Sequence, residues 1–217
     1  MTIVGFGYRD WALNIYFQLQ KLSSHKMIII KDLGNVDFSF LDILKPDFVL
    51  FYGWSWKLPV EVISTYRCLM LHPSDLPKYR GGSPIQNQIL NGILDSKVTI
   101  FQVTEEIDAG PILAQRPLSL RGEMSEILGR IEQCGLEATT EILKGEYEIS
   151  TQDNSNTSFY SRRNPSQSEI TFEELRSASA LDIYNKVRCL QDPYPNAFIR
   201  MSDGLKLYLK SVALNDD

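Results

Sequence analysis

One histidine stands at the end of a short apolar run, where an imidazole is well placed for proton transfer. His72 directly follows Cys68–Leu71 and precedes a turn-forming segment that begins with Pro73. Ligands of α/β proteins bind at the carboxyl ends of parallel strands, which is where this imidazole would lie. The residue types leave two readings of equal weight: a proton-transfer group, or a hydrogen-bonded histidine near the surface.

An acidic loop follows a second strand-like segment. Asp108 lies a few residues after the apolar run Val98–Val103. If that strand adjoins the one before His72, the carboxylate can approach the imidazole and fix its tautomer, as the acid of a catalytic triad does. The alternative is a solvated acidic loop, which is the preferred reading of Glu105 and Glu106.

The amino-terminal segment carries part of a dinucleotide-binding pattern. Gly5 and Gly7 have Gly-x-Gly spacing and the acidic Asp32 follows the next apolar run, but the third glycine of the pattern is absent. That glycine allows a helix to pack closely on the strand with its N-terminus facing a pyrophosphate. We therefore interpret the glycines as a tight strand-to-helix turn and not as a dinucleotide site. A nicotinamide enzyme ranks third among the functions that we consider. Neither His25 nor His72 has the neighbouring Cys or His spacing of a metal site, so no metal is expected.

The composition excludes several classes of protein. The chain has 217 residues, 43% of them apolar, which is enough for a packed core of ordinary size. Its net charge is −5 and its densest basic cluster is the pair Arg162-Arg163, which argues against binding nucleic acid, including whole tRNA, by charge alone. No apolar stretch approaches the roughly 18 residues of a membrane span. The three widely spaced cysteines predict buried thiols in a reduced compartment, so we expect a cytoplasmic protein.

The arrangement of elements predicts an α/β fold. Short β-branched runs alternate with helical segments, which is typical of a mostly parallel, Rossmann-like sheet covered by helices. The expected strands are Ile3–Val4, Met27–Ile30, Phe48–Phe51, Cys68–Leu71 and Val98–Val103. The expected helices are one capped by Asp10, residues 84–91 after an N-cap Ser83, residues 123–144 closed by Gly145, and one from a capping box at Ser179 and Asp182 to about Leu190.

A polar stretch divides the chain. Residues 150–158 are turn-rich and have almost nothing to bury, so the sequence predicts a catalytic domain over residues 1–150 and a carboxy-terminal appendage over 151–217. The appendage is expected to hold a linker, a helix and a β-hairpin over 197–209 that turns at Asp203-Gly204. The apolar side chains of this hairpin either form a subunit contact in a homodimer or pack on their own domain.

The segments around His72 and Asp108 resemble the formyltransferases that use N10-formyl-tetrahydrofolate. The similarity runs in order from His72 to Ile112, through His72-Pro-Ser-Asp-Leu-Pro-Lys-Tyr-Arg-Gly-Gly-Ser-Pro, Asn91-Gly92, Val98-Thr99-Ile100 and Ile107-Asp108-Ala109-Gly110-Pro111-Ile112. Beyond the polar stretch, Phe159–Ile170 and Tyr184–Phe198 are similar to the branch that acts on nucleotide-linked 4-amino sugars. The resemblance covers nearly the whole chain.

This resemblance implies an N-formyltransferase that moves a formyl group from N10-formyl-tetrahydrofolate to the 4-amine of a UDP- or dTDP-linked 4-amino-4,6-dideoxy sugar, for surface polysaccharide or lipopolysaccharide synthesis. His72 would be the general base or proton relay, and Asp108 would orient it. The implied folate-binding residues are Phe51, Tyr52, Gly53, Trp54, Val103, Thr104, Ile107 and Asp108. The implied sugar-nucleotide residues are Lys78, Arg80, Gly81, Gly82, Arg162, Arg163 and Tyr194, the last of which would stack on the base.

The sequence departs from the family pattern at Met70, where the family has a catalytic asparagine, and at Asp75, where it has leucine. A thioether cannot donate a hydrogen bond to the oxyanion that forms during formyl transfer. Three explanations remain: protonated His72 donates instead, activity is lost, or another N–H substitutes, such as a backbone amide or Gln86, Asn87 or Asn91. We favour substitution. The alternative functions are a catalytically impaired folate and nucleotide-sugar binding protein, or a glycinamide-ribonucleotide-type formyltransferase.

Overall fold

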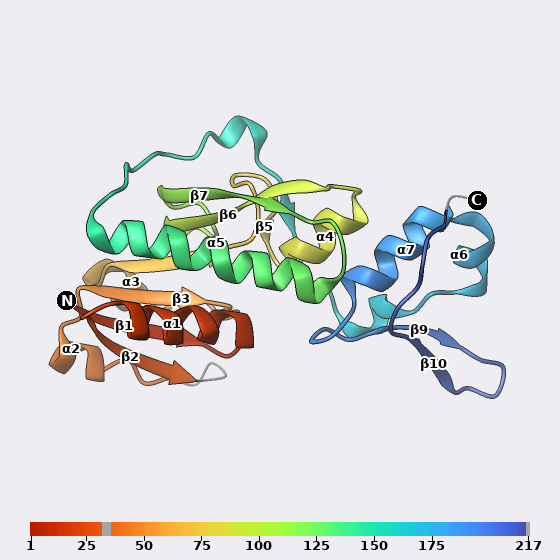
Figure 1. The fold of residues 1–217 in the computed structure, drawn as a ribbon, viewed down its shortest axis with the longest axis horizontal. Helices are drawn as coiled ribbons and strands as arrows, with labels where there is room; N and C mark the ends of the chain where they lie inside the picture. Colours follow the sequence, from red (N-terminus) through yellow and green to blue (C-terminus); the bar gives the residue numbers. More distant parts are fainter. Residues whose placement is uncertain (32–35, 216–217) are drawn as a thin grey trace.

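A six-stranded sheet forms the centre of the molecule (Figure 1). The computed structural model describes residues 1–31 and 36–215, so Asp32 lies outside the described residues. The strands follow the order β2-β1-β3-β4-β6-β7, with bounds β1 Thr2–Gly7, β2 Lys26–Lys31, β3 Phe48–Tyr52, β4 Cys68–His72, β6 Asp95–Gln102 and β7 Ile112–Ser119. The first four are parallel to one another, while β6 and β7 are antiparallel to their neighbours. The predicted mostly parallel α/β sheet is confirmed.

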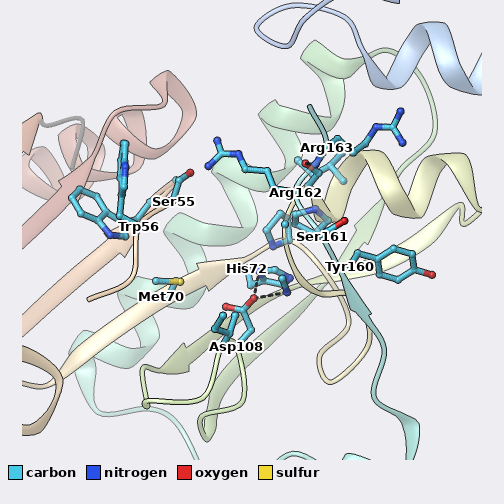
Figure 2. Close-up of a pocket in the computed structure, with 18 of the residues that line it drawn as sticks. Ser55, Trp56, Met70, His72, Asp108, Tyr160, Ser161, Arg162 and Arg163 are labelled. Atoms are coloured by element: carbon cyan, nitrogen blue, oxygen red, sulfur yellow. Dashed lines mark hydrogen bonds and ion pairs between the residues drawn. The ribbon is translucent and has the colours of Figure 1, made fainter. Parts of the chain in front are cut away.

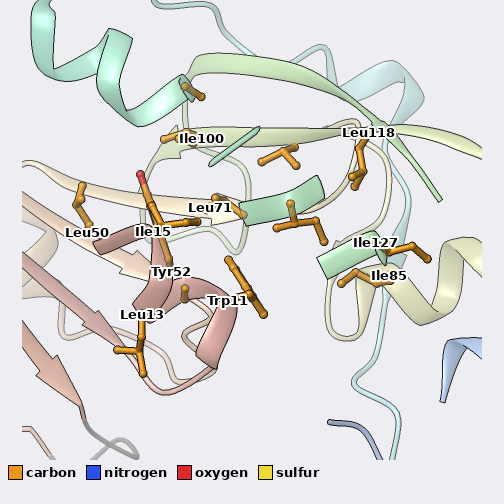
Figure 3. Packing of buried hydrophobic residues seen from close by; sticks show 14 of the residues in the cluster. Trp11, Leu13, Ile15, Leu50, Tyr52, Leu71, Ile85, Ile100, Leu118 and Ile127 are labelled. Carbon is orange, nitrogen blue, oxygen red and sulfur yellow. The ribbon is translucent and has the colours of Figure 1, made fainter. Parts of the chain in front are cut away.

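Alternation of side chains along the strands builds one apolar core on each face of the sheet. On β3, Leu50 and Tyr52 point to one face and Val49 and Phe51 to the other. The first face is covered by α1 (Asp10–Leu22) and α5 (Met124–Lys144), whose packing Figure 3 shows. The second face is covered by the short helices α2 (Phe40–Leu44) and α3 (Val60–Thr65). Both faces are thereby closed, as a parallel sheet requires.

The predicted helices and hairpin are present. Helix α4 spans Pro84–Leu90, α5 ends at Gly145 with a φ of 81°, and α7 (Ala180–Cys189) begins at the predicted capping box. The hairpin consists of β9 (Ala197–Arg200) and β10 (Lys206–Leu209). One predicted cap is wrong: Asp10 is the first residue of α1, and Arg9 is its N-cap. Ser83 is the N-cap of α4 and precedes an N1 proline, as predicted, but its hydroxyl accepts from the Arg163 N–H and not from an N–H of the helix.

The polar stretch 150–158 packs against the central part of the molecule. Ser150 forms a β-bridge with Ile112, a 3-10 turn spans Asn154–Asn156, and β8 (Phe159–Tyr160) then pairs in parallel with β5 (Arg80–Gly81). The chain continues through a 3-10 turn at Pro165–Ser168 and α6 (Phe172–Ser177). As predicted, this stretch buries almost nothing: its side chains are exposed except those of Gln152 and Ser158, which are half-buried. Hydrogen bonds of those two polar side chains hold it in place.

The carboxy-terminal part shares the main core. Ile170 and Val187 are fully buried in the same apolar cluster as α1 and α5, and α7 packs on α4. Cys68 and Cys189 are buried and Cys134 is half-buried, as the sequence predicts. In the described part of the chain, none of the helices combines the length and apolar character needed to cross a bilayer.

Candidate active site

A cavity of about 630 Å³ opens at the carboxyl ends of β3 and β4 (Figure 2). Its wall is formed by the β1–α1 turn, the segment after β3, the turn before α4, the loop 103–108 and residues 159–165. A volume of this size is typical of small-molecule sites. His72 and Asp108 both line it, as do most of the other predicted site residues.

His72 is held with its two ring nitrogens in different environments. The side chain is 5% exposed at the end of β4, and Nε2 lies 2.8 Å from the carbonyl oxygen of Tyr79. A carbonyl can only accept, so Nε2 carries a proton and donates it. In the neutral ring Nδ1 is then the basic nitrogen. The tautomer is set by Tyr79 and not, as the sequence suggested, by Asp108.

Asp108 lies beside the free nitrogen of that ring. Its Oδ2 is 3.6 Å from His72 Nδ1, which is an ion-pair distance and longer than a hydrogen bond, and the same oxygen accepts from the Gly81 N–H at 2.8 Å. The predicted approach of the two side chains is confirmed, but the path differs. Because β6 runs antiparallel to β4, the loop after Gln102 starts at the far end of β4 and folds back to reach His72.

Two residues fix the backbone of Asp108, which has a left-handed φ of 53°. The Arg80 guanidinium donates to Gln152 Oε1 at 3.1 and 2.7 Å and to Asn154. Gln152 Nε2 in turn donates to the carbonyl oxygens of Asp108 and Gly110, at 2.9 and 2.8 Å. Arg80 is only 3% exposed, does not line the cavity and donates to Gln152, Asn154 and Glu106, so its geometry gives no support to the predicted contact with the diphosphate. Gln152 lies in a polar stretch without a motif, so no signal in the sequence pointed to it.

The predicted folate-binding residues divide into two groups. Gly53, Trp54, Val103, Thr104 and Ile107 line the cavity together with Asp108. Phe51 and Tyr52 do not: Phe51 stacks on Phe6 in the core, and the Tyr52 hydroxyl bonds Thr139 beneath α5. The cavity thus begins one residue after β3 ends. The indole Nε1 of Trp54 is buried and has no hydrogen-bond partner among the described residues.

Met70 is half-buried in the cavity wall close to His72 and Asp108, as Figure 2 shows. It packs against the apolar side chains of Leu76 and Phe101. Of the three amides considered as substitutes for the family's asparagine, Asn87 donates to the Gly82 carbonyl and Asn91 to two tyrosine hydroxyls. Only Gln86 lines the cavity with an unpaired amide nitrogen.

Five of the predicted sugar-nucleotide residues line the cavity: Gly81, Gly82, Arg162, Arg163 and Tyr194. Lys78 is exposed outside it. The two glycines allow residues 160–162 to pass close by. A Cβ at Gly81 would lie 2.3 Å from the carbonyl oxygen of Tyr160, and a Cβ at Gly82 would lie 2.4 Å from the Arg162 Cα. Trp56 also lines the cavity, next to Trp54. Arg9 lines it too and is a residue that the sequence analysis did not single out.

Comparison with known proteins agrees with this geometry. Residues 37–143 match the family described as formyl transferase. The methionyl-tRNA formyltransferase of Macrococcus caseolyticus is 31% identical over 186 residues, which cover 81% of this chain and 58% of that protein. The chain thus spans little more than half the length of such curated relatives.

Solved structures with the same fold include two formyltransferases of different substrate class. A methionyl-tRNA formyltransferase from Clostridium thermocellum superimposes with a TM-score of 0.83 at 29% identity, covering 96% of each chain. A 4-N formyltransferase from Francisella tularensis superimposes with a TM-score of 0.78 at 17% identity, covering 100% of this chain and 98% of that one. The sugar branch is therefore not singled out, and what these comparisons show is a match of residues 37–143 to the formyl transferase family.

Proposed function

We propose that the chain transfers a formyl group from N10-formyl-tetrahydrofolate to the 4-amine of a UDP- or dTDP-linked 4-amino-4,6-dideoxy sugar. The observation that carries this proposal is the basic Nδ1 of His72 facing Asp108 inside a cavity that has one apolar and one cationic wall. The first wall suits a flat heterocycle and the second suits phosphates.

The apolar wall fits the folate. Trp54, Ile63, Met70 and Val103 form it, next to the exposed edge of the loop 103–108. The unpaired Trp54 Nε1 supplies a buried donor that a heteroatom of the pterin would satisfy. The folate supplies the electrophilic formyl carbon when it is bound.

His72 and Asp108 would handle the proton of the acceptor amine. Nδ1 takes a proton as the amine nitrogen bonds to the formyl carbon, and the imidazolium that results is stabilised by the Asp108 carboxylate 3.6 Å away. The proton then passes to the departing N10 nitrogen, so charge is restored. Burial of both side chains keeps bulk water from competing for that proton.

Negative charge that develops on the formyl oxygen needs a donor that Met70 lacks. The unpaired Nε1 of Trp54 is the side-chain candidate on the folate side, with the formyl oxygen as the alternative acceptor to a pterin heteroatom. Removing one such donor from an enzyme typically costs on the order of 10²–10³ in rate, so a substitute is worth testing directly.

Methionyl-tRNA is the second candidate acceptor, because the curated relative and the Clostridium structure are methionyl-tRNA formyltransferases. The net charge of −5 disfavours it, since binding a tRNA backbone requires clustered cations. A cytoplasmic location, a homodimer through the β9–β10 hairpin, and a role in surface polysaccharide synthesis remain parts of the sugar proposal.

Mass spectrometry of an acceptor panel tests the proposal. The protein is incubated with N10-formyl-tetrahydrofolate and UDP- and dTDP-4-amino sugars, glycinamide ribonucleotide and methionyl-tRNA. We expect formylation of a nucleotide sugar. Formylation of the tRNA or the ribonucleotide alone would overturn the acceptor assignment, and formylation of none would favour a folate and nucleotide-sugar binding protein.

A further inference from the structure

Arg9 lies in the wall of the cavity, directly before α1. Its guanidinium lies 4.8 Å from the ring centre of Tyr8 and 5.3 Å from that of Tyr194, in the wall of the cavity. No carboxylate among the described residues pairs with it. Two aromatic rings next to a guanidinium restrict its orientation. The N–H groups, which lie in the plane of the guanidinium, stay free to bind an anion.

A second arginine, Arg162 in the segment after β8, lies next to the same Tyr8. Arg162 Nη2 lies 3.5 Å from the Tyr8 hydroxyl, which also bonds Ser55 Oγ at 2.6 Å. In Figure 2 the Arg162 side chain extends across the cavity toward Ser55. Burial alone would raise the pKa of Tyr8, but the hydrogen bonds with Ser55 and Arg162 and the charges of Arg9 and Arg162 outweigh it and lower that pKa. The surroundings of this hydroxyl therefore favour negative charge.

A buried amide completes the group. Gln86 is 3% exposed and lines the cavity from α4. Its side chain contacts the Tyr194 hydroxyl, which opposes the rise in the pKa of Tyr194 that burial causes, but Nε2 has no well-aligned hydrogen-bond acceptor among the described residues. A buried donor without an aligned acceptor is destabilising. A ligand oxygen in the cavity would supply that acceptor.

The distribution of charge along the cavity separates this group from the folate side. The acidic lining residues, Glu105, Glu106 and Asp108, all belong to one loop. The cationic lining residues near Tyr194 come from the β1–α1 turn and from residues 162–163, next to the N-terminus of α1, where the helix dipole also favours anions.

We propose that Arg9, Arg162 and the Gln86 amide bind a phosphate group of the acceptor substrate, with Tyr8 and Tyr194 holding Arg9 in place. This inference rests on the proposed function, and it adds Arg9 and Gln86 to the residues that select a phosphorylated acceptor. A phosphate held there leaves the remainder of the acceptor to extend toward His72 within the same cavity.

Calorimetric titration without turnover tests the subsite. UDP and dTDP are the phosphate probes, and 5-formyl-tetrahydrofolate is the probe for the other wall. Arg9→Gln and Gln86→Leu are compared with Arg176→Gln, which removes an exposed arginine of α6 outside the cavity. Because a charge-assisted hydrogen bond contributes about 1.5–3 kcal/mol, we expect the nucleotide Kd to rise about 10- to 100-fold in Arg9→Gln. We expect a smaller rise in Gln86→Leu, less than about twofold in Arg176→Gln, and an unchanged folate Kd in all three.

Each result decides for or against the subsite. The subsite is overturned if neither nucleotide binds the unaltered protein. It is also overturned if Arg9→Gln binds the nucleotides as tightly as the unaltered protein does. A loss of folate affinity instead would assign Arg9 to the carboxylates of the folate tail and also overturn it. Nucleotide binding that depends on Arg9, in a protein that formylates no sugar, would support the subsite while refuting the proposed acceptor.

Discussion

At the scale of single residues, the site depends on which nitrogen of His72 carries the proton. The Tyr79 carbonyl takes the N–H of Nε2, which leaves Nδ1 as the base that faces both the cavity and Asp108. A histidine at the end of an apolar run was visible in the sequence, as was the acidic loop. The carbonyl that selects the tautomer was not, because it depends on how residues 73–79 turn back over the imidazole.

Met70 shows how a departure from the family pattern can be compensated in packing. It packs against Leu76 and Phe101, so we expect Met70→Asn to place a polar amide against apolar neighbours. The variant should lose about 1–2 kcal/mol of unfolding free energy, measured in urea, without an increase in kcat. A clear rise in kcat would mean that the donor role has not been filled elsewhere.

The buried thiols predict a loss of stability at alkaline pH. Burial raises the pKa of Cys68 from its ordinary value of 9.0 to about 12. Above pH 9 the unfolded chain loses this proton and the folded chain keeps it, so the contribution is complete below pH 9 and falls as pH rises toward 12. By about pH 11 the loss of unfolding free energy from this thiol amounts to roughly 3 kcal/mol.

Cys68→Ala isolates this contribution. The variant should lose stability at about pH 8 through lost packing, but its stability should decline less steeply with pH than that of the unaltered protein. Urea unfolding at about pH 8 and about pH 11 measures the difference. If the unfolding free energies of the two proteins fall equally between these pH values, the alkaline loss does not come from this thiol.

At the scale of elements, the loop 103–111 is positioned by a segment distant in sequence. The Arg80–Gln152 pair holds the carbonyl oxygens on either side of Ala109, which keeps Asp108 in its left-handed conformation next to His72. The elements themselves followed from apolar runs, caps and glycines. The antiparallel direction of β6 and the contacts of residues 150–154 did not, since neither has a local signature in the sequence.

Gln152→Ala should therefore weaken catalysis without weakening folate binding. We expect kcat for formyl transfer to fall about 10-fold or more while the Kd for 5-formyl-tetrahydrofolate changes less than about twofold, because misplacing a catalytic group costs rate more than binding. Gln133→Ala, which removes an exposed glutamine of α5, is the matched control. Equal effects of the two substitutions would show that Gln152 does not position the loop.

At the scale of the whole molecule, the core crosses the predicted boundary at residue 150. Val187 of α7 and Ile127 of α5 belong to one buried cluster, so residues 1–150 and 151–217 should unfold together. All three tryptophans lie in the first part, and their fluorescence reports on it alone. The extent to which a thiol reagent labels Cys189, measured by mass spectrometry of the peptide that contains it, reports on the second part. The two urea midpoints should coincide, whereas separate midpoints would establish two independent units.

The measurement that tests the central claim most directly is the paired quantification of tetrahydrofolate and formylated nucleotide sugar by mass spectrometry. It is made for the unaltered protein, His72→Ala and Asp108→Asn, with folding checked by folate binding. The account predicts equal amounts of the two products, with rates reduced at least 10²-fold in both variants. Release of tetrahydrofolate without formylated acceptor, or undiminished transfer by His72→Ala, would contradict it.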